Sequence, residues 1–487
     1  MSSTTESSTA AAPVSRVIRK NVAFVGLAYG VGAAAGFVAQ AVIARELGPA
    51  VFGEYIAALS LVTILAVLYE AASTEYLVRE TARARSRIGE LLGDLLLVKL
   101  LAGTVVGVLA VGAGLALGFT GSELALTALI AVMLGANAVA RPFRAGLQGL
   151  ERMGVVSALS IINSVVSSAG MVALVATGHG IVAALAFSAL VSLAVVPLSW
   201  LALRREVRVS PRASLSGART VVREGLPFTA VSLLTYATSY ADAIIIRVLL
   251  GVTQTGQYGA AYRLFVVLQF LPAIYFDSVL RTMSHLATQA GTAFRDFIER
   301  SAAALFLLAL PIAAGGVALA EPIVETVFGS AYGDAVPVFR VLLVSLPLSF
   351  PAWILLPAIL VGERTGSAGR ILAVALTANV AANLALVESG GIVASAWITV
   401  ATDAGIALAT TVVLARQGVV LRWLRLAAPA LPAAGFVGLA AFALRDLPLP
   451  VPVLAGALVY AAGLKLAGFP QRLGISGFGG LLGGRAG

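Results

Sequence analysis

The chain has 487 residues, of which 59% are hydrophobic and 11% are charged, and its mean hydropathy is +0.98. A soluble domain carries about a quarter charged residues, so this composition excludes a soluble fold. The 33 lysines and arginines outnumber the 23 acidic residues and give a formal net charge of +10, while the absence of cysteine excludes disulfides and thiol chemistry.

Apolar stretches recur along the whole chain, and each is long enough to cross a hydrocarbon core about 30 Å thick as a helix. They lack the alternating pattern of barrel strands, so we predict an all-α integral membrane protein with about fourteen transmembrane helices. The predicted spans are 21–43, 55–76, 92–118, 123–146, 155–177, 180–202, 226–250, 257–280, 300–319, 337–360, 371–388, 391–414, 427–444 and 449–467.

The N-terminal segment 1–20 is rich in Ser, Thr and Ala and ends in the basic residues Arg16, Arg19 and Lys20. The apolar stretch that follows is of spanning length, which is too long for the apolar core of a cleaved signal peptide. We therefore predict a disordered cytosolic tail followed by a retained helix.

Basic residues gather in alternate connections between the spans, including the segments 79–87, 141–152, 204–223 and 281–300. Cytosolic loops of membrane proteins carry an excess of Lys and Arg, so this distribution places those connections and both termini in the cytosol. We predict a multi-pass protein of the cell membrane. Topology explains the positive charge, so no nucleic acid is expected as a partner.

A sequence repeat divides the chain into two halves. The pattern Leu47-Gly48-(x4)-Gly53-x-Tyr55-x-Ala57-Ala58-(x2)-Leu61 recurs 203 residues later, from Leu250 to Leu264. The copies lie six spans apart, so the repeats are parallel, which is a known transporter architecture. The predicted domains are the tail 1–20, a six-helix lobe 21–202, a cytosolic linker 203–225, a second six-helix lobe 226–415, two additional transmembrane helices 416–470 and a flexible C-terminal tail 471–487.

Polar residues inside the spans are the candidate binding residues, because a charge in lipid costs several kcal/mol and usually faces a cavity or a partner. Asn379 and Asn383 are four residues apart, so both amides point to the same side of one helix. Pairing between helices and, for the arginines, snorkelling toward a membrane surface are the competing explanations. The candidates for a substrate cavity are Asp242, Arg263, Arg247, Arg45, Asn379 and Asn383.

The motifs of several enzyme classes are missing from the sequence. None of the three lysines follows a glycine, so there is no phosphate-binding P-loop, and no Asp-x-Asp pair is present. His179 and His285 stand alone in the sequence, without the clustering that a metal site or a nucleophile dyad requires. We predict a protein that is not an enzyme and that has no resident metal or cofactor, with possible coupling to H⁺ or Na⁺.

Seven motifs between about Arg16 and Arg416 resemble one family of membrane proteins, the O-antigen flippase-like polysaccharide flippases of the multidrug/oligosaccharidyl-lipid/polysaccharide exporter superfamily. They are Ala44-Arg45-Glu46-Leu47-Gly48-Pro49 with Phe52-Gly53-Glu54-Tyr55, Gln148-Gly149-Leu150-Glu151-Arg152, Glu224-Gly225-Leu226-Pro227 with Tyr240-Ala241-Asp242, Gly256-Gln257-Tyr258-Gly259-Ala260-Ala261-Tyr262-Arg263-Leu264, Val327-Phe328-Gly329-Ser330-Ala331-Tyr332, Gly362-Glu363-Arg364 and Asn379 to Asn383.

The resemblance implies a two-lobed bundle that moves a polyprenyl- or dolichyl-linked oligosaccharide from the cytosolic to the outer leaflet by alternating access, for surface polysaccharide or glycoprotein assembly. Asp242 and Arg263 match motif positions and are the cavity residues it implies. Membrane lipid and glycan-assembly proteins are further expected partners. The alternatives are a drug/ion antiporter or a peptidoglycan-precursor flippase of the same superfamily, or a non-transporting scaffold of a glycan assembly complex.

Overall fold

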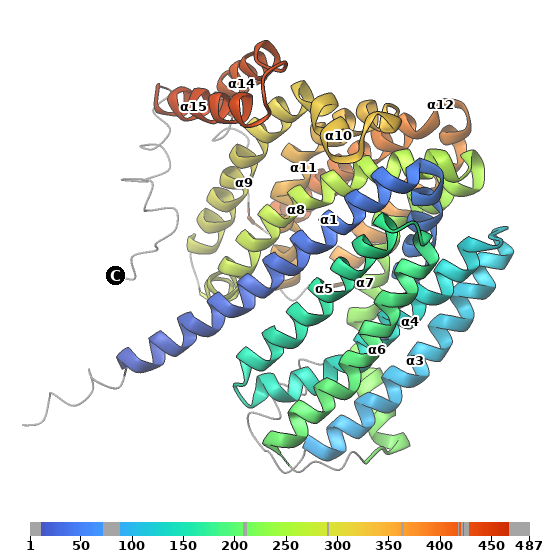
Figure 1. The fold of residues 1–487 in the computed structure, drawn as a ribbon. Coiled ribbons are helices and arrows are strands. Elements are labelled where there is room, and N and C mark those ends of the chain that lie inside the picture. Colours follow the sequence, from blue (N-terminus) through green and yellow to red (C-terminus); the bar gives the residue numbers. More distant parts are fainter. Residues whose placement is uncertain are drawn as a thin grey trace, which may run out of the picture. The chain divides into compact units, whose positions relative to one another are not determined.

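The protein is built from long helices (Figure 1). The computed structural model describes residues 11–71, 88–207, 212–289, 292–361, 365–416, 418–419, 422 and 428–466. Within these ranges the regular elements are all helices, without any strand. The prediction of an all-α fold is confirmed.

Two of the helices are much longer than a membrane is thick. They are α1 (Ala11–Ala66) and α12 (Thr365–Arg416). A straight helix of 52 residues is about 78 Å long, more than twice the thickness of a hydrocarbon core. Each is broken at a glycine, Gly48 with φ 76° and ψ 174° and Gly391 with φ 64° and ψ −165°. Only glycine adopts such angles readily, so each long helix consists of two passes.

Ten helices of the described residues are long and apolar enough to cross a membrane. Because two of these contain a break, they supply twelve passes, and two shorter apolar helices bring the number to fourteen, as predicted. The other crossing helices are α3 (Ile88–Ala116), α4 (Ser122–Gly149), α5 (Met153–Ala176), α6 (Gly180–Glu206), α7 (Leu215–Leu250), α8 (Val252–Ala287), α9 (Ala293–Ala318) and α11 (Ala335–Val361), and the shorter ones are α14 (Leu431–Ala443) and α15 (Pro450–Leu466).

Some predicted boundaries differ from the helix ends. Helix α1 begins at Ala11, inside the predicted tail 1–20, and residues 1–10 lie outside the described ranges. The predicted linker 203–225 holds the end of α6 and the first turns of α7. The predicted C-terminal tail 471–487 also lies outside the described ranges.

The repeat predicted from the sequence has a counterpart in the backbone. Gly251 precedes α8 with φ 86° and ψ 178°, close to the angles of Gly48. The tyrosines of the two copies, Tyr55 and Tyr258, are both buried. The same short pattern therefore produces the same helix reversal twice in the chain.

The chain forms two compact units, Met1–Tyr240 and Ala241–Gly487, here called unit 1 and unit 2. In unit 1, α1 packs on α5 and α4, and α4 also packs on α6 and α3. Ser214 caps α7, because its hydroxyl accepts a hydrogen bond from the Gly217 amide at 3.0 Å. Its own amide donates to the buried Asp94 carboxylate of α3 at 2.7 Å, which ties the start of α7 to α3.

In unit 2, α11 is the central helix and packs on α12, α9 and α8. Helix α14 packs on α15 and α9, and the Tyr460 hydroxyl of α15 donates to the Leu307 carbonyl of α9 at 2.7 Å. Gln257, near the start of α8, binds the connection before α11. It donates to the Ala331 carbonyl at 2.8 Å and accepts from the Ala335 amide at 3.1 Å, so these helix ends lie together.

Candidate functional site

A buried carboxylate of unit 2 is the candidate functional site. Asp242 lies on α7 and is only 3% exposed. Its Oδ2 accepts hydrogen bonds from the Tyr258 hydroxyl of α8 at 3.0 Å and from the Thr399 hydroxyl of α12 at 3.1 Å. Its Oδ1 accepts one from the Asn383 amide at 3.1 Å. Three donors from two other helices thus surround this carboxylate.

The two asparagines of α12 extend the site from Asp242. Asn383 Nδ2 also lies 2.9 Å from the carbonyl oxygen and 3.2 Å from the Oδ1 of Asn379. Asn379 in turn donates to the Thr402 hydroxyl at 3.2 Å. The two amides therefore point to the same side, as their spacing predicts. We call Asp242, Tyr258, Asn379, Asn383 and Thr399 the Asp242 cluster.

Several polar atoms beside the cluster are buried without a hydrogen-bond partner among the described residues. They are Asn383 Oδ1, the Ser395 hydroxyl and Asp403 Oδ2. Ser395 and Asp403 lie one helical turn before and after Thr399 on α12. All three atoms can accept a hydrogen bond or face a cation, so the region holds more acceptors than the protein itself satisfies.

The structure brings together three of the six predicted site residues, Asp242, Asn379 and Asn383. The three arginines lie elsewhere. Arg45 is exposed on α1 in unit 1, and Arg247 and Arg263 are half-buried on α7 and α8 in unit 2. The donors to the Asp242 carboxylate among the described residues are a tyrosine, a threonine and an asparagine, which are all uncharged.

Sequence reasoning missed two members of the cluster. Tyr258 stood out only as part of the repeat and of a family motif, and Thr399 was not singled out. Thr399 and Asp403 are four residues apart in an apolar span, so they share one face of α12. That spacing, read together with Asn379 and Asn383, was the signal that could have found Thr399.

Unit 1 contains a polar group of a different kind in the middle of its helices. Asn163 of α5 donates to Asn137 Oδ1 of α4 at 3.1 Å, and Asn137 donates to the Ser192 hydroxyl of α6 at 3.3 Å. Ser192 completes the circle by donating to Asn163 Oδ1 at 3.3 Å. The three side chains, here called the Asn137 ring, are neutral, and each donates to another member of the ring.

Arg144 lies beside this ring, although the sequence placed it in a cytosolic connection. It belongs to α4, and its guanidinium lies 3.4 Å from the Asn137 carbonyl and 3.5 Å from the Ser160 hydroxyl. Side chains of a helix lean toward its N-terminus, which here carries the guanidinium away from the nearer end of α4. The charge therefore lies deeper than the position of Arg144 in the sequence suggests.

The chemistry available to the Asp242 cluster is that of a carboxylate held in an apolar span. The three donors stabilise its ionised form, while burial among apolar helices favours taking up a proton or a cation. Its oxygen atoms are the ligands that hard cations prefer. Among the described residues, no group of three His, Cys, Asp or Glu side chains is arranged to hold a metal ion.

One comparison with known proteins gives the family, and another gives the fold. The family model described as "Polysaccharide biosynthesis protein" matches residues 18–284, more than half of the chain. A comparison with curated protein sequences gives no match.

Among solved structures, the chain is similar to the lipid II flippase MurJ in its inward closed conformation. The TM-score is 0.73 at 12% identity, over 93% of this chain and 99% of that one. It is also similar to a multidrug resistance MATE family transporter of the MOP superfamily in its inward-facing conformation, with a TM-score of 0.57 at 17% identity over 80% of this chain and 94% of that one. At these identities the likeness concerns the fold, which is that of these all-helical transporters.

Proposed function

The chain belongs to the polysaccharide biosynthesis protein family, and from this premise we propose that it moves a polyprenyl- or dolichyl-linked oligosaccharide across the cell membrane. Movement runs from the cytosolic to the outer leaflet by alternating access, with both termini in the cytosol. The likeness to MurJ supports this proposal, because MurJ has the same fold and is a lipid II flippase. No covalent chemistry is part of the proposed function.

The Asp242 cluster is the observation that carries the proposed mechanism. A carboxylate in the middle of an apolar bundle is costly and is a functional candidate by default. We assign it the role of binding a proton or a sodium ion whose gradient drives transport. The acceptors near it, Asn383 Oδ1 and Asp403 Oδ2, are further oxygen atoms that such an ion could meet.

Substrate flipping in proteoliposomes tests the proposal. A fluorescent polyprenyl-pyrophosphate oligosaccharide is incorporated, and the fraction reached by an added quencher is followed with a proton gradient, with a sodium gradient and with neither. We expect the wild-type protein to flip the lipid faster under one of the two gradients. The Asp242→Asn variant should lose that acceleration, because an amide binds neither ion as a carboxylate does.

The control is Asp296→Asn, the same substitution at an exposed aspartate, which should behave like the wild type. Equal flipping by Asp242→Asn and the wild type under every gradient would exclude the coupling role. A wild-type protein that flips lipid II but no lipid-linked oligosaccharide would favour the peptidoglycan-precursor function. A protein that flips neither lipid would favour the antiporter or the scaffold.

A further inference from the structure

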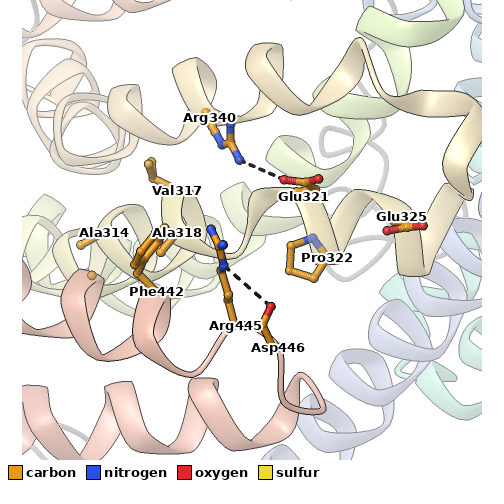
Figure 2. Close-up of a pocket in the computed structure, with 11 residues that line it drawn as sticks. Ala314, Val317, Ala318, Glu321, Pro322, Glu325, Arg340, Phe442, Arg445 and Asp446 are labelled. Carbon is orange, nitrogen blue, oxygen red and sulfur yellow. Dashed lines mark ion pairs between the residues drawn. The ribbon is translucent and has the colours of Figure 1, made fainter.

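Unit 2 contains a cavity of about 790 Å³ that is separate from the Asp242 cluster. Figure 2 shows it between the end of α9, the short helix α10 (Ala320–Phe328), the first turns of α11 and the end of α14. Helix α9 has 26 residues and is about 39 Å long, enough to cross the hydrocarbon core, so its end lies at a membrane surface. The cavity is therefore at headgroup depth.

Two arginines face this cavity, one from α11 and one from the turn after α14 (Figure 2). Arg340 of α11 forms an ion pair with Glu321, and its Nη2 is 3.5 Å from Glu321 Oε2. Arg445, just after α14, forms an ion pair with Asp446, and its Nε is 3.8 Å from Asp446 Oδ1. The Arg445 guanidinium also covers the ring of Phe442, 4.4 Å from its centroid. Each ion pair engages one guanidinium nitrogen at a long distance, whereas a guanidinium can hold a phosphate through two parallel hydrogen bonds.

Carboxylates outnumber the arginines in the lining. The lining contains the carboxylates of Glu321, Glu325 and Asp446 and the guanidinium groups of Arg340 and Arg445, so its formal charge is −1. A simple anion is disfavoured by that balance. A ligand that carries both a phosphate and an ammonium group meets a partner for each charge.

An apolar wall continues the cavity along the contact between α9 and α14. It is formed by Ala314, Val317, Gly438 and Phe442. Such a wall suits the glycerol and upper acyl chain of a lipid better than a water-soluble ligand. The combination of charged rim and apolar wall is the chemistry of a phospholipid at a membrane surface.

We propose that this cavity is a binding site for a zwitterionic phospholipid of the phosphatidylethanolamine class. The phosphate lies between Arg340 and Arg445, the ammonium group lies at Glu325, and an acyl chain runs along Phe442. Since α9 is the crossing helix on which α14 packs, the bound lipid joins the two C-terminal helices to the rest of unit 2. The site is independent of the transported substrate.

Lipid titration followed by native mass spectrometry tests this proposal on the full-length protein in detergent. Phosphatidylethanolamine should bind at least about tenfold more tightly than phosphatidylglycerol, because a charge-assisted hydrogen bond exceeds the free energy of a tenfold affinity change. Soluble glycerophosphoethanolamine should bind far more weakly than the whole lipid, which separates lipid binding from capture of a free phosphate compound. Equal binding of the two lipids, or tighter binding of phosphatidylglycerol, would overturn the assignment.

Variants locate the site. Arg340→Gln and Arg445→Gln should each weaken phosphatidylethanolamine binding about tenfold. Glu325→Gln should mainly remove the preference over phosphatidylglycerol. The control is Arg295→Gln, whose guanidinium also pairs with the next residue, Asp296, at 3.0 Å outside the cavity, and its affinity should be unchanged. Arginine variants that bind like this control would overturn the proposal.

Discussion

Each unit carries a polar group inside its apolar helices, and the two groups differ in charge and in how fully their hydrogen bonds are satisfied. The Asn137 ring of unit 1 is neutral, and its three side chains donate to one another. The Asp242 cluster of unit 2 contains a carboxylate and lies beside buried acceptors that have no partner among the described residues. The ring has the properties of a connection between helices, whereas the cluster has those of a binding site.

The repeat allows the two units to be compared position by position. The repeat offset of 203 residues places Tyr55 at the position of Tyr258 but Ala39 at the position of Asp242. Ala39 is 2% exposed, as buried as the carboxylate to which it corresponds. The two units thus share a helix reversal and a buried tyrosine, and only unit 2 has an ionisable group there.

The largest expected effect comes from placing a carboxylate in unit 1. Ala39→Asp creates a buried charge without the donors that surround Asp242, so the free energy of unfolding should fall by about 3–5 kcal/mol. Thermal and denaturant unfolding in detergent measure the change. Ala39→Asn, of almost the same size and neutral, is the control and should cost less. An equal loss in both variants would mean that the volume of the added side chain, and not its charge, causes the cost, which would weaken the comparison of the two units.

Removing the carboxylate of unit 2 gives the next largest effect. Asp242→Ala leaves the Tyr258 hydroxyl without its acceptor, whereas Thr399 and Asn383 keep the carbonyls of Ser395 and Asn379. We expect a loss of about 2 kcal/mol in the free energy of unfolding, the cost of one unsatisfied buried donor. Asp242→Asn should cost less than about 1 kcal/mol. Its oxygen can still accept from the two hydroxyls, and the Asn383 amide can turn its unpartnered oxygen toward the new NH₂ group.

The same unfolding assay compares the two substitutions. An Asp242→Asn variant as unstable as Asp242→Ala would show that the negative charge itself holds these helices together. The cluster would then be a structural ion site, and the ion-coupling proposal would lose its basis. Flipping activity of Asp242→Asn is interpretable because this variant is expected to stay folded.

The sequence predicted the membrane class, the number of helices and the family, because these depend on apolar length and on motifs of many residues. It also singled out Asp242, Asn379 and Asn383, which lie together in the structure, since polar side chains stand out in apolar spans. It could not show which spans pack so that their polar side chains meet. Arg263 shares α8 with Tyr258 but is five residues away, which turns it about 140° around the helix from the tyrosine. Counting basic residues also does not show which way the Arg144 side chain leans.

The Asn137 ring should contribute to stability and have no part in ion dependence. Asn163→Ala removes two of the ring hydrogen bonds. Hydrogen bonds between membrane helices average about 0.6 kcal/mol, so the expected loss in the free energy of unfolding is about 1 kcal/mol. The response of flipping to proton and sodium gradients should match the wild type. A changed ion response would mean that unit 1 also contributes to coupling, and the contrast between the units would fail.

The smallest effect tests whether the Tyr258 hydroxyl recognises the charge of Asp242. A double-mutant cycle of Tyr258→Phe and Asp242→Asn should give a coupling free energy of about 0.6 kcal/mol or more, since hydrogen bonds to a charged group exceed the neutral average. Phenylalanine keeps the stacking on Tyr262, where the ring centroids are 5.9 Å apart, so the hydroxyl alone is removed.

Tyr275 provides the matched control for this cycle, because it lies on the same helix and donates to the Ser301 hydroxyl at 3.0 Å instead. Tyr275→Phe combined with Asp242→Asn should give no coupling, as the two side chains share no partner. If the Tyr258 cycle also gives none, its hydroxyl hydrogen-bonds equally well to an acid and to an amide. The Asp242 cluster would then resemble the Asn137 ring, with hydrogen bonds that join helices and do not respond to charge. A clear coupling would instead mean that the charge of Asp242 is present in the folded protein and is recognised by its neighbours.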